Sequence, residues 1–212
     1  MARCALCGAK AQYQDRHSGQ YVCPAHARLE VVAAARRPQQ PPLTIRRVTA
    51  VDRHRVAELA LYFWDETEVE CFGRSYDVLT CPAFLACGGE EAVGLAAYSV
   101  EAGLDAVVLV MLNLLPAYQG RGGGGALVDA VLDEAARLGQ ARVLVATSND
   151  DLPALAVYQR HGFHLAELIP DGIANHHGGE LVGLAGIPIR DEIRLERLVS
   201  SALPPPAFIS GA

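Results

Sequence analysis

Residues 112–127 hold the feature that most constrains this chain, an apolar run that enters a turn, a glycine-rich stretch and then a helical pattern. Five of the six positions from Gly120 to Gly125 are glycine. Glycine permits positive φ and close approach of a ligand to the backbone, and a helix N-terminus carries roughly half a positive charge. We therefore expect main-chain N–H groups here to bind the phosphate of a small molecule.

Two other phosphate-binding motifs use the same physics, and the spacing argues against both. A P-loop closes on Gly-Lys-Ser/Thr, whereas Gly125 is followed by Ala126. Residues 120–125 fit Gly-x-Gly-x-x-Gly formally, but a dinucleotide fold also needs an acidic residue at the end of the next strand. The strand predicted at 142–146 runs into Thr147 and Ser148 instead. The remaining alternative is a glycine-rich loop without a ligand.

Composition indicates one globular domain with a small appendage, since 212 residues are 51% hydrophobic. No apolar run reaches the roughly 18 residues of a membrane span, and the N-terminus lacks a signal-peptide core, so we expect a cytoplasmic protein with no membrane partner. The net charge is −6, with six basic and two acidic residues in 1–37. The acidic remainder argues against nucleic acid as the main partner and suits a cationic amine substrate.

The N-terminal cysteines have the spacing of a metal site. A Cys-x-x-Cys pair and a Cys-x-x-His pair are separated by fifteen residues, and tetrahedral Zn²⁺ takes thiolates and imidazoles in this number. Residues 12–22 alternate around Ser18-Gly19 as a β-hairpin would. The segment resembles zinc-ribbon or treble-clef modules, with a structural Zn²⁺ and four ligands: Cys4, Cys7, Cys23 and His26. Fortuitous pairing or a redox Cys-x-x-Cys are the alternatives, and Cys71, Cys81 and Cys87 are expected to be buried free thiols.

Proline and glycine positions divide the chain. Residues 1–28 form the predicted zinc-ribbon-like module, and 29–42 a helix and proline-rich linker, the helix covering 25–37 and ending before Pro38-Gln-Gln-Pro-Pro42. The main domain is predicted at 43–200, and 201–212 as a disordered tail.

Hydrophobic periodicity in the main domain predicts an α/β fold, a mixed sheet flanked by helices. A capping box at Thr49-x-x-Asp52 precedes the first predicted helix, which extends to Phe63. Two further helices are predicted, one from the glycines to Gly139 and one at 152–161. The predicted strands are 43–48, 83–87, 92–100, 106–112, 142–146, 163–168 and 191–198. For the last of these segments a helix is the alternative.

Two motifs together resemble the GCN5-related N-acetyltransferases (GNAT). The first is residues 116–124, with its Gln-x-x-Gly-x-Gly core, and the second is 149–163, with its Tyr-x-x-x-Gly-Phe ending. The resemblance covers about 43–200. It implies a fold with a mostly antiparallel sheet and an enzyme that uses acetyl-CoA as cosubstrate. Residues 186–195 resemble the closing strand of one branch of the family.

The resemblance also implies a set of site residues. The pyrophosphate would lie on Gln119, Gly120, Arg121, Gly122, Gly123, Gly124 and Gly125. The pantetheine arm would run along Leu112, Asn113 and Leu114, with contacts from Asn149 and Asp151. Tyr158 would be the catalytic residue beside the thiolate leaving group, as a hydrogen-bond donor and late proton donor, because a phenol is a weaker acid than a thiol.

The chain departs from the family at two points. Asp151 stands where asparagine is common, which removes an N–H₂ donor, and 107–112 lack the glutamate that often serves as general base. A positioned base contributes about 10²–10⁴-fold to rate. Five side chains are candidates, and the sequence does not choose among them: Glu68, Glu70, Glu101, Asp105 and His176.

We therefore expect an acetyl-CoA-dependent N-acetyltransferase that acts on a primary amine of a small molecule or a protein. A non-catalytic acyl-CoA sensor or interaction module is the second hypothesis, and a zinc-ribbon nucleic-acid adaptor is the third. The acceptor regions, 65–81 and 170–186, carry no motif that names the substrate. The sequence also leaves open whether the chain forms a homodimer.

Overall fold

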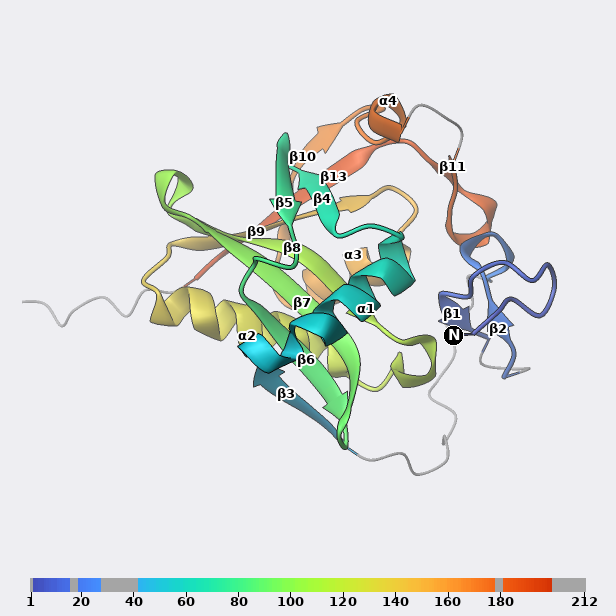
Figure 1. The fold of residues 1–212 in the computed structure, drawn as a ribbon. Coiled ribbons are helices and arrows are strands. Elements are labelled where there is room, and N and C mark those ends of the chain that lie inside the picture. Colours follow the sequence, from blue (N-terminus) through green and yellow to red (C-terminus); the bar gives the residue numbers. More distant parts are fainter. Residues whose placement is uncertain (1, 16–18, 28–41, 178–180, 200–212) are drawn as a thin grey trace, which may run out of the picture.

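The computed structural model describes residues 2–15, 19–27, 42–177 and 181–199. Figure 1 shows a central twisted sheet with helix α1 on one face and helices α2 and α3 on the other, and a small N-terminal module at one end of it. We use "N-terminal module" for residues 2–15 and 19–27. The predicted linker from 29 to 41 and the predicted tail at 201–212 lie outside the described residues.

Within the described residues the main sheet has seven strands in the order β10-β13-β9-β8-β7-β6-β3. All neighbours are antiparallel except β8 and β9, so the predicted mixed, mostly antiparallel sheet is confirmed. Residues 192–198 form a strand and not a helix, inserted between β9 and β10. The strands are β3 (Leu43–Arg47), β6 (Ala83–Gly88), β7 (Glu91–Glu101), β8 (Ala106–Leu114), β9 (Arg142–Ser148), β10 (His164–Ile169) and β13 (Glu192–Leu198).

Each face of the sheet has its own hydrophobic cluster. Helix α1 (Arg53–Trp64) packs Val56, Leu59 and Ala60 against one face. Helix α2 (Gly123–Arg137) packs Leu127 and Val131 against the other, where α3 (Leu152–Arg160) also lies. Apolar residues at spacings of three and four place one stripe of each helix on the sheet, as the periodicity predicts.

Besides the hairpin of the N-terminal module, two short hairpins of the described residues lie outside the main sheet, and the sequence analysis missed both. The first pairs β4 (Glu68–Cys71) with β5 (Arg74–Asp77), and the second pairs β11 (Leu181–Val182) with β12 (Pro188–Ile189). In β4, exposed glutamates alternate with Val69 and Cys71, which point into the α1-side cluster. Four residues are too few for such an alternation to stand out from a loop.

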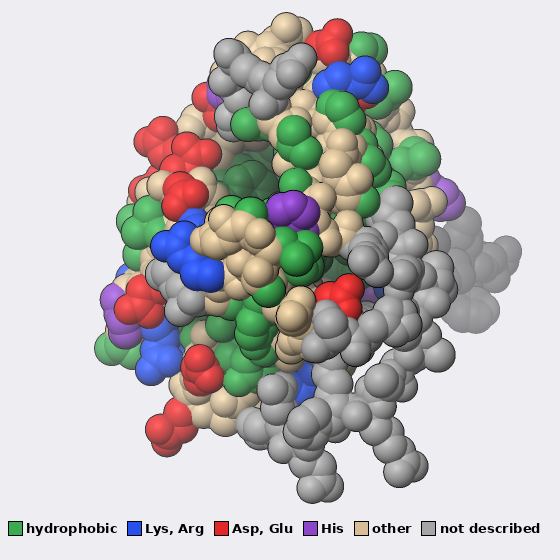
Figure 2. Space-filling view, turned by 90° about the vertical axis from the view of Figure 1, so that its right-hand side faces the viewer, with side chains coloured by type: hydrophobic (Ala, Val, Ile, Leu, Met, Phe, Trp, Pro, Cys, Tyr) green, Lys and Arg blue, Asp and Glu red, His purple; other side chains and the backbone are tan. Residues whose placement is uncertain are grey.

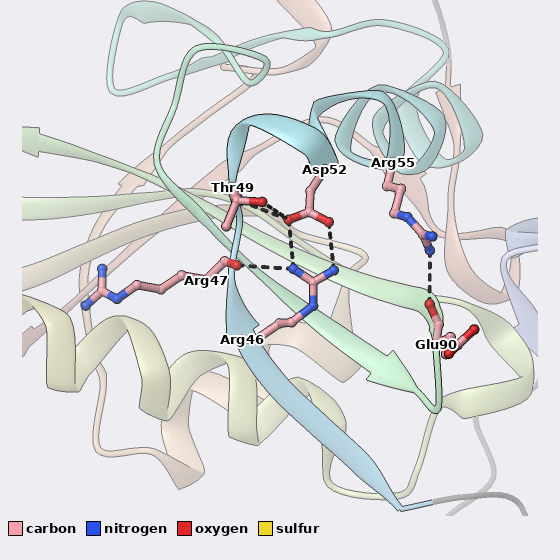
Figure 3. A network of polar contacts seen from close by, with 6 residues as sticks. All are labelled: Arg46, Arg47, Thr49, Asp52, Arg55 and Glu90. Atoms are coloured by element: carbon pink, nitrogen blue, oxygen red, sulfur yellow. Dashed lines mark hydrogen bonds and ion pairs between the residues drawn. The ribbon is translucent and has the colours of Figure 1, made fainter.

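Polar contacts at the start of α1 fix strand β3 to the helices on both faces (Figure 3). The Arg46 guanidinium donates two hydrogen bonds of 2.7 Å to the two carboxylate oxygens of Asp52. The backbone N–H and the hydroxyl of Thr49 donate to the same carboxylate at 2.9 and 2.6 Å, so the predicted capping box is confirmed. The neighbouring Arg47 extends to the other face, where it pairs with buried Glu134 of α2.

The N-terminal module has its own small core. Strands β1 (Tyr13–Gln14) and β2 (Tyr21–Val22) are antiparallel, which agrees with the predicted hairpin, although its turn at 16–18 lies outside the described residues. A 3₁₀ turn covers Pro24–His26, but Ala27 is extended (ψ 141°). The predicted helix at 25–37 is therefore wrong at its start, because the chain leaves the helical region after one turn.

Membrane insertion by a helix finds no support in the part of the chain that the structure describes, where every helix is too short or too polar to cross a bilayer.

Candidate active site

The central feature of the site is a point where two parallel strands stop pairing. Strands β8 and β9 are in register from Ala106↔Arg142 to Leu109↔Val145, although β8 continues to Leu114 and β9 to Ser148. Residues 110–114 of β8 and 146–148 of β9 no longer pair with each other, and we call these two segments the β8–β9 fork. On its other side, β8 pairs with β7 in a register that steps over Val110. A bulge of this kind bends a strand, so Val110 marks the place where the two strands separate.

The glycine-rich stretch lies directly after the β8 arm of the fork. Gly120 and Gly122 have positive φ (69° and 85°), and α2 begins at Gly123. A Cβ on Gly123 would approach Leu43 to 2.6 Å, and one on Gly125 would approach the His161 ring to 2.8 Å. These glycines are thus required by backbone conformation or by packing.

Gly124 differs from its neighbours, because a Cβ there would meet nothing within 4 Å and its φ is not positive. Neither packing nor backbone conformation requires a glycine at this position. Open space beside the first turn of a helix is where backbone N–H groups can meet an anion. The structure therefore places the predicted phosphate-binding residues at a helix N-terminus with room beside it.

Gln119 and Arg121 use their side chains within the protein. The Gln119 amide donates to the backbone oxygens of Gln12 at 2.9 Å and of Leu114 at 3.0 Å. The first bond crosses to the N-terminal module, so the side chain links the module to the end of β8. The Arg121 guanidinium lies over the Tyr118 ring, 5.7 Å from its centroid.

The predicted pantetheine-binding residues of β8 face both sides of the sheet. Leu112 and Leu114 contact the cluster on the α2 side. Asn113 faces the α1 side, where its Oδ1 accepts a 2.8 Å hydrogen bond from the indole N–H of Trp64. Trp64 is the only tryptophan of the chain, and 45% of its surface is exposed. The sequence analysis did not single it out, and its position at a helix end gives no local signal.

The residues that follow β9 are engaged mainly with the 183–191 segment. The Asn149 amide donates to the Pro188 oxygen at 2.9 Å, and its own oxygen accepts from the N–H groups of Arg190 and Asp191. Its side chain thus fixes the loop at 188–191. The sequence analysis predicted a cofactor contact for Asn149 and did not include this role. Buried Asp150 accepts hydrogen bonds from the Ser148 hydroxyl and, at 2.9 Å, from the N–H of Leu184.

Asp151 and Tyr158, which follow β9, both have pKa values shifted by burial and by nearby charge. Asp151 caps α3 by accepting a 3.2 Å hydrogen bond from the N–H of Ala154. Burial, with the charge of Asp150, raises the pKa of Asp151 to about 6. Tyr158 is buried with its ring 5.7 Å from that of Phe163, and burial together with the Asp151 charge raises its pKa above that of a free phenol. The phenol therefore keeps its proton at neutral pH.

Tyr13 of the N-terminal module belongs to the same group, and the sequence analysis did not single it out. Burial raises the pKa of Tyr13, with further contributions from the charges of Asp151 and Asp150. Its strand β1 also lies against Pro116–Tyr118, the turn after β8. Nothing in the sequence connects residue 13 with residue 151, since only the folded chain brings the module to the fork.

The five candidate bases fall into different places. Glu101 pairs with Arg74, and Asp105 accepts from the N–H of Ala141; both lie where β8 begins, the end opposite the fork. By contrast, Glu70 and His176 come together with 2.9 Å between Oε2 and Nε2, each about half exposed. Glu68 is exposed on the same strand as Glu70.

The face that carries the module also carries an acidic surface. Figure 2 shows this face, which is hollowed and has acidic side chains gathered along one side. Four exposed acids follow one another between α1 and the end of β4: Asp65, Glu66, Glu68 and Glu70.

The four predicted metal ligands lie together in the N-terminal module. Their ligand atoms are all within 4.8 Å of one another. His26 Nδ1 is 3.5 Å from the sulfur of Cys4 and 3.3 Å from that of Cys23, and the sulfurs of Cys7 and Cys23 are 3.7 Å apart. Burial acts to raise the pKa of Cys4, but hydrogen bonds from backbone N–H groups and from His26 outweigh it and lower the pKa to about 6.

Comparison with known proteins agrees with this geometry. The description "Acetyltransferase (GNAT) family" belongs to the family model that matches residues 48–163, more than half of the chain. The uncharacterized protein YdhI of Bacillus subtilis (strain 168) is 28% identical over 113 residues, which are 51% of this chain and 68% of that protein.

Solved structures show the same fold at low identity. The IAA acetyltransferase from Bacillus cereus ATCC 14579 gives a TM-score of 0.62 at 21% identity, over 74% of this chain and 99% of that chain. A Bacillus subtilis acetyltransferase solved in complex with CoA gives 0.57 at 19% identity, over 75% and 100%.

The matched family model, together with this fold, thus defines an acyltransferase. The chain belongs to the GNAT acetyltransferase family. It is an acetyl-CoA-dependent N-acetyltransferase, as the sequence resemblance predicts.

We predict that Asp151→Asn stabilises the protein at pH 7.5 by about 1–3 kcal/mol. The folded protein raises the Asp151 pKa from 3.8 to about 6, so it disfavours the carboxylate that the unfolded chain carries. The contribution of Asp151 to stability should fall as pH rises from about 4 to about 6, and the asparagine variant lacks this loss.

Urea unfolding at pH 4.5 and 7.5 measures the effect, with Asp133→Asn on the exposed face of α2 as the matched control. The gain should be small at pH 4.5 and full at pH 7.5. Equal stability of Asp151→Asn and the unaltered protein at pH 7.5 would contradict the electrostatic account.

Proposed function

We propose that the β8–β9 fork holds the pantetheine arm of acetyl-CoA and that the backbone of Gly122–Gly125 binds its diphosphate. The observation that carries this proposal is the position of the fork, which opens immediately before a glycine-rich helix N-terminus. The acetyl group would pass to a primary amine of a small molecule or a protein. In this proposal residues 43–200 form the transferase domain, 1–28 a metal module and 29–42 their linker, with 201–212 as a tail.

Backbone groups of β8 support the pantetheine site. An extended amide-containing chain can pair with a strand edge as an added strand would. Residues 110–114 offer such an edge because β9 does not pair with them. At Val110 the bulge leaves a backbone position outside the ladder with β7. An N–H group there would polarise the thioester carbonyl, in the manner of an oxyanion hole.

Tyr158 would act on the leaving thiolate from the α2 side of the sheet. An ordinary thiol has a pKa of about 8.5 and an ordinary phenol about 10. Burial raises the Tyr158 pKa further, so full proton transfer early in the reaction is unfavourable. The phenol would donate a hydrogen bond to sulfur as negative charge develops and deliver the proton late.

The acceptor would approach from the α1 side. Glu70 and His176 meet there across two segments, the β4 strand and the short helix α4 (Ala174–His177). A primary amine is cationic at neutral pH and must lose a proton before it attacks. The exposed carboxylates on this face would attract the cation, and the His176–Glu70 pair is the proposed route by which its proton leaves.

Gly124→Leu tests the diphosphate site. We expect acetyl-CoA affinity to fall about tenfold or more, because a side chain would fill the open space beside the α2 N-terminus. Thermal stability should not fall, since leucine is a better helix former than glycine. Isothermal titration calorimetry measures affinity, and Gly103→Leu, at an exposed glycine that also has open space around its Cβ position, is the control.

Thiol release with a panel of primary amines, run on the unaltered protein, separates an enzyme from an acyl-CoA sensor. Release of CoA that depends on the amine supports transfer. Tight binding without release supports the sensor, and unchanged affinity in Gly124→Leu would contradict the proposed diphosphate site.

Tyr158→Phe is expected to lower kcat about 10²-fold or more while the KM for acetyl-CoA changes little, because the hydroxyl acts only as charge develops on sulfur. Tyr76→Phe is the matched control: the Tyr76 hydroxyl is buried and finds no hydrogen-bond partner among the described residues. Steady-state kinetics with a thiol-detecting assay measures both. A kcat for Tyr158→Phe equal to that of the control would remove Tyr158 from the mechanism.

We further propose that Cys4, Cys7, Cys23 and His26 bind a structural zinc ion. Four ligands at about 2.3 Å in a tetrahedron lie roughly 3.8 Å apart. Three of the separations here are 3.3–3.7 Å, and all the ligand atoms lie within 4.8 Å of one another. Four protein ligands leave no open position for substrate, so the metal would stabilise the module. Among the described residues its core cluster holds four buried side chains of the module and Leu184 from outside it, which is too little apolar surface for the module to fold alone.

Metal analysis tests this site. The purified protein should hold about one zinc per chain, and Cys4→Ala should lose it while Cys81→Ala, a buried cysteine outside the cluster, keeps it. Equal zinc content in both variants would contradict the assignment.

A further inference from the structure

The N-terminal module contacts the β8 arm of the fork through Gln119. One amide group donates both to Leu114 at the end of β8 and to the Gln12 oxygen of the module. Strand β1 lies against Pro116–Tyr118, directly before Gln119. The side chain of Gln119, which directly precedes the glycine-rich stretch, therefore connects that stretch to the module.

The module is connected to the β9 arm through Leu184 and Asp150, because the Asp150 carboxylate also accepts a hydrogen bond from the Ser148 hydroxyl of that arm. Leu184 is buried in the same cluster as Cys4 and Cys23, and its N–H donates to the Asp150 carboxylate at 2.9 Å. The fit is close, since a Cβ on Gly183 would overlap that carboxylate. Tyr13 lies near enough to Asp150 and Asp151 to feel their charges.

A third set of contacts joins the module to the end of α1. Lys10 pairs with Asp65 at 2.5 Å and also donates to the Leu61 oxygen at 3.2 Å. The Tyr62 hydroxyl donates to the Ala11 oxygen at 2.8 Å, and this bond is buried. The next side chains are those of Trp64 and Asn113, which connect α1 to the β8 arm.

We infer that the metal-bound module borders the transferase site and fixes the two arms of the fork relative to each other. Beyond Leu109 and Val145 no register pairs β8 with β9 in the described chain, so backbone hydrogen bonds between them do not set their separation. The module contacts α1 directly, and it is linked to the two arms through Gln119 and through Leu184 with Asp150. Metal loading at Cys4, Cys7, Cys23 and His26 therefore controls acetyl-CoA binding at a distance, with Gln119 as the positioning residue. This inference rests on the proposed function.

The test compares the full chain loaded with zinc and the same chain stripped by a chelator, by calorimetric titration with CoA. We expect CoA affinity to fall about tenfold on stripping. The emission of Trp64, the single tryptophan, should shift at the same time, because the nearby contacts of Lys10 with Asp65 and of Tyr62 with Ala11 loosen. Equal CoA affinity in both forms overturns the inference, whereas failure of the loaded form to bind CoA overturns the proposed function.

A second variant keeps the test decisive if stripping unfolds the whole chain. Gln119→Met preserves side-chain length but removes both donor bonds, and in the loaded protein it should weaken CoA binding about fivefold. Gln159→Met is the control, because within the described part of the chain the Gln159 amide donates to the Leu155 oxygen of its own helix and to no other segment. Where the stripped form stays folded, stripping should change CoA affinity less in Gln119→Met than in the unaltered chain. Unchanged affinity in loaded Gln119→Met overturns the role of Gln119.

Discussion

The structure depends on the loss of backbone pairing between β8 and β9. Up to Leu109 and Val145 the two strands satisfy each other's hydrogen-bonding groups, and beyond that point each pairs only on its outer side. Unpaired strand edges in a protein interior are costly unless something completes them. The bulge at Val110 creates the gap, and the glycine-rich turn that follows supplies a positively polarised helix end next to it. An extended thioester with a diphosphate has the groups that both features need.

The electrostatics of the fork are arranged around this opening. The α2 side buries Tyr158, and this burial together with the Asp151 charge raises the pKa of the phenol. On the α1 side Asp65, Glu66, Glu68 and Glu70 are exposed, so the surface there is acidic. Arg46 with Asp52, and Arg47 with Glu134, bind β3 to α1 and α2, which stabilises the far edge of the sheet while the fork stays free of pairing.

Much of the fold could be predicted from local signals. The capping box at Thr49, the helix opening at the glycines and the alternation at 192–198 depend on neighbours in sequence, and each is confirmed. What the sequence could not show depends on contacts between distant residues. The side chains of Gln119 and Asn149 bind backbone groups more than 35 residues away, at Gln12 and Pro188. Tyr13 reaches the fork only through the folded module, and at Ala27 the chain turns extended where helix propensity predicted otherwise.

A structure determined with acetyl-CoA bound tests the central claim most directly. The account predicts that the pantetheine arm lies between residues 110–114 and 146–148, with the diphosphate at the backbone of Gly122–Gly125 and the thioester next to Val110. Cofactor density elsewhere on the protein, or an empty fork at saturating acetyl-CoA, would contradict it.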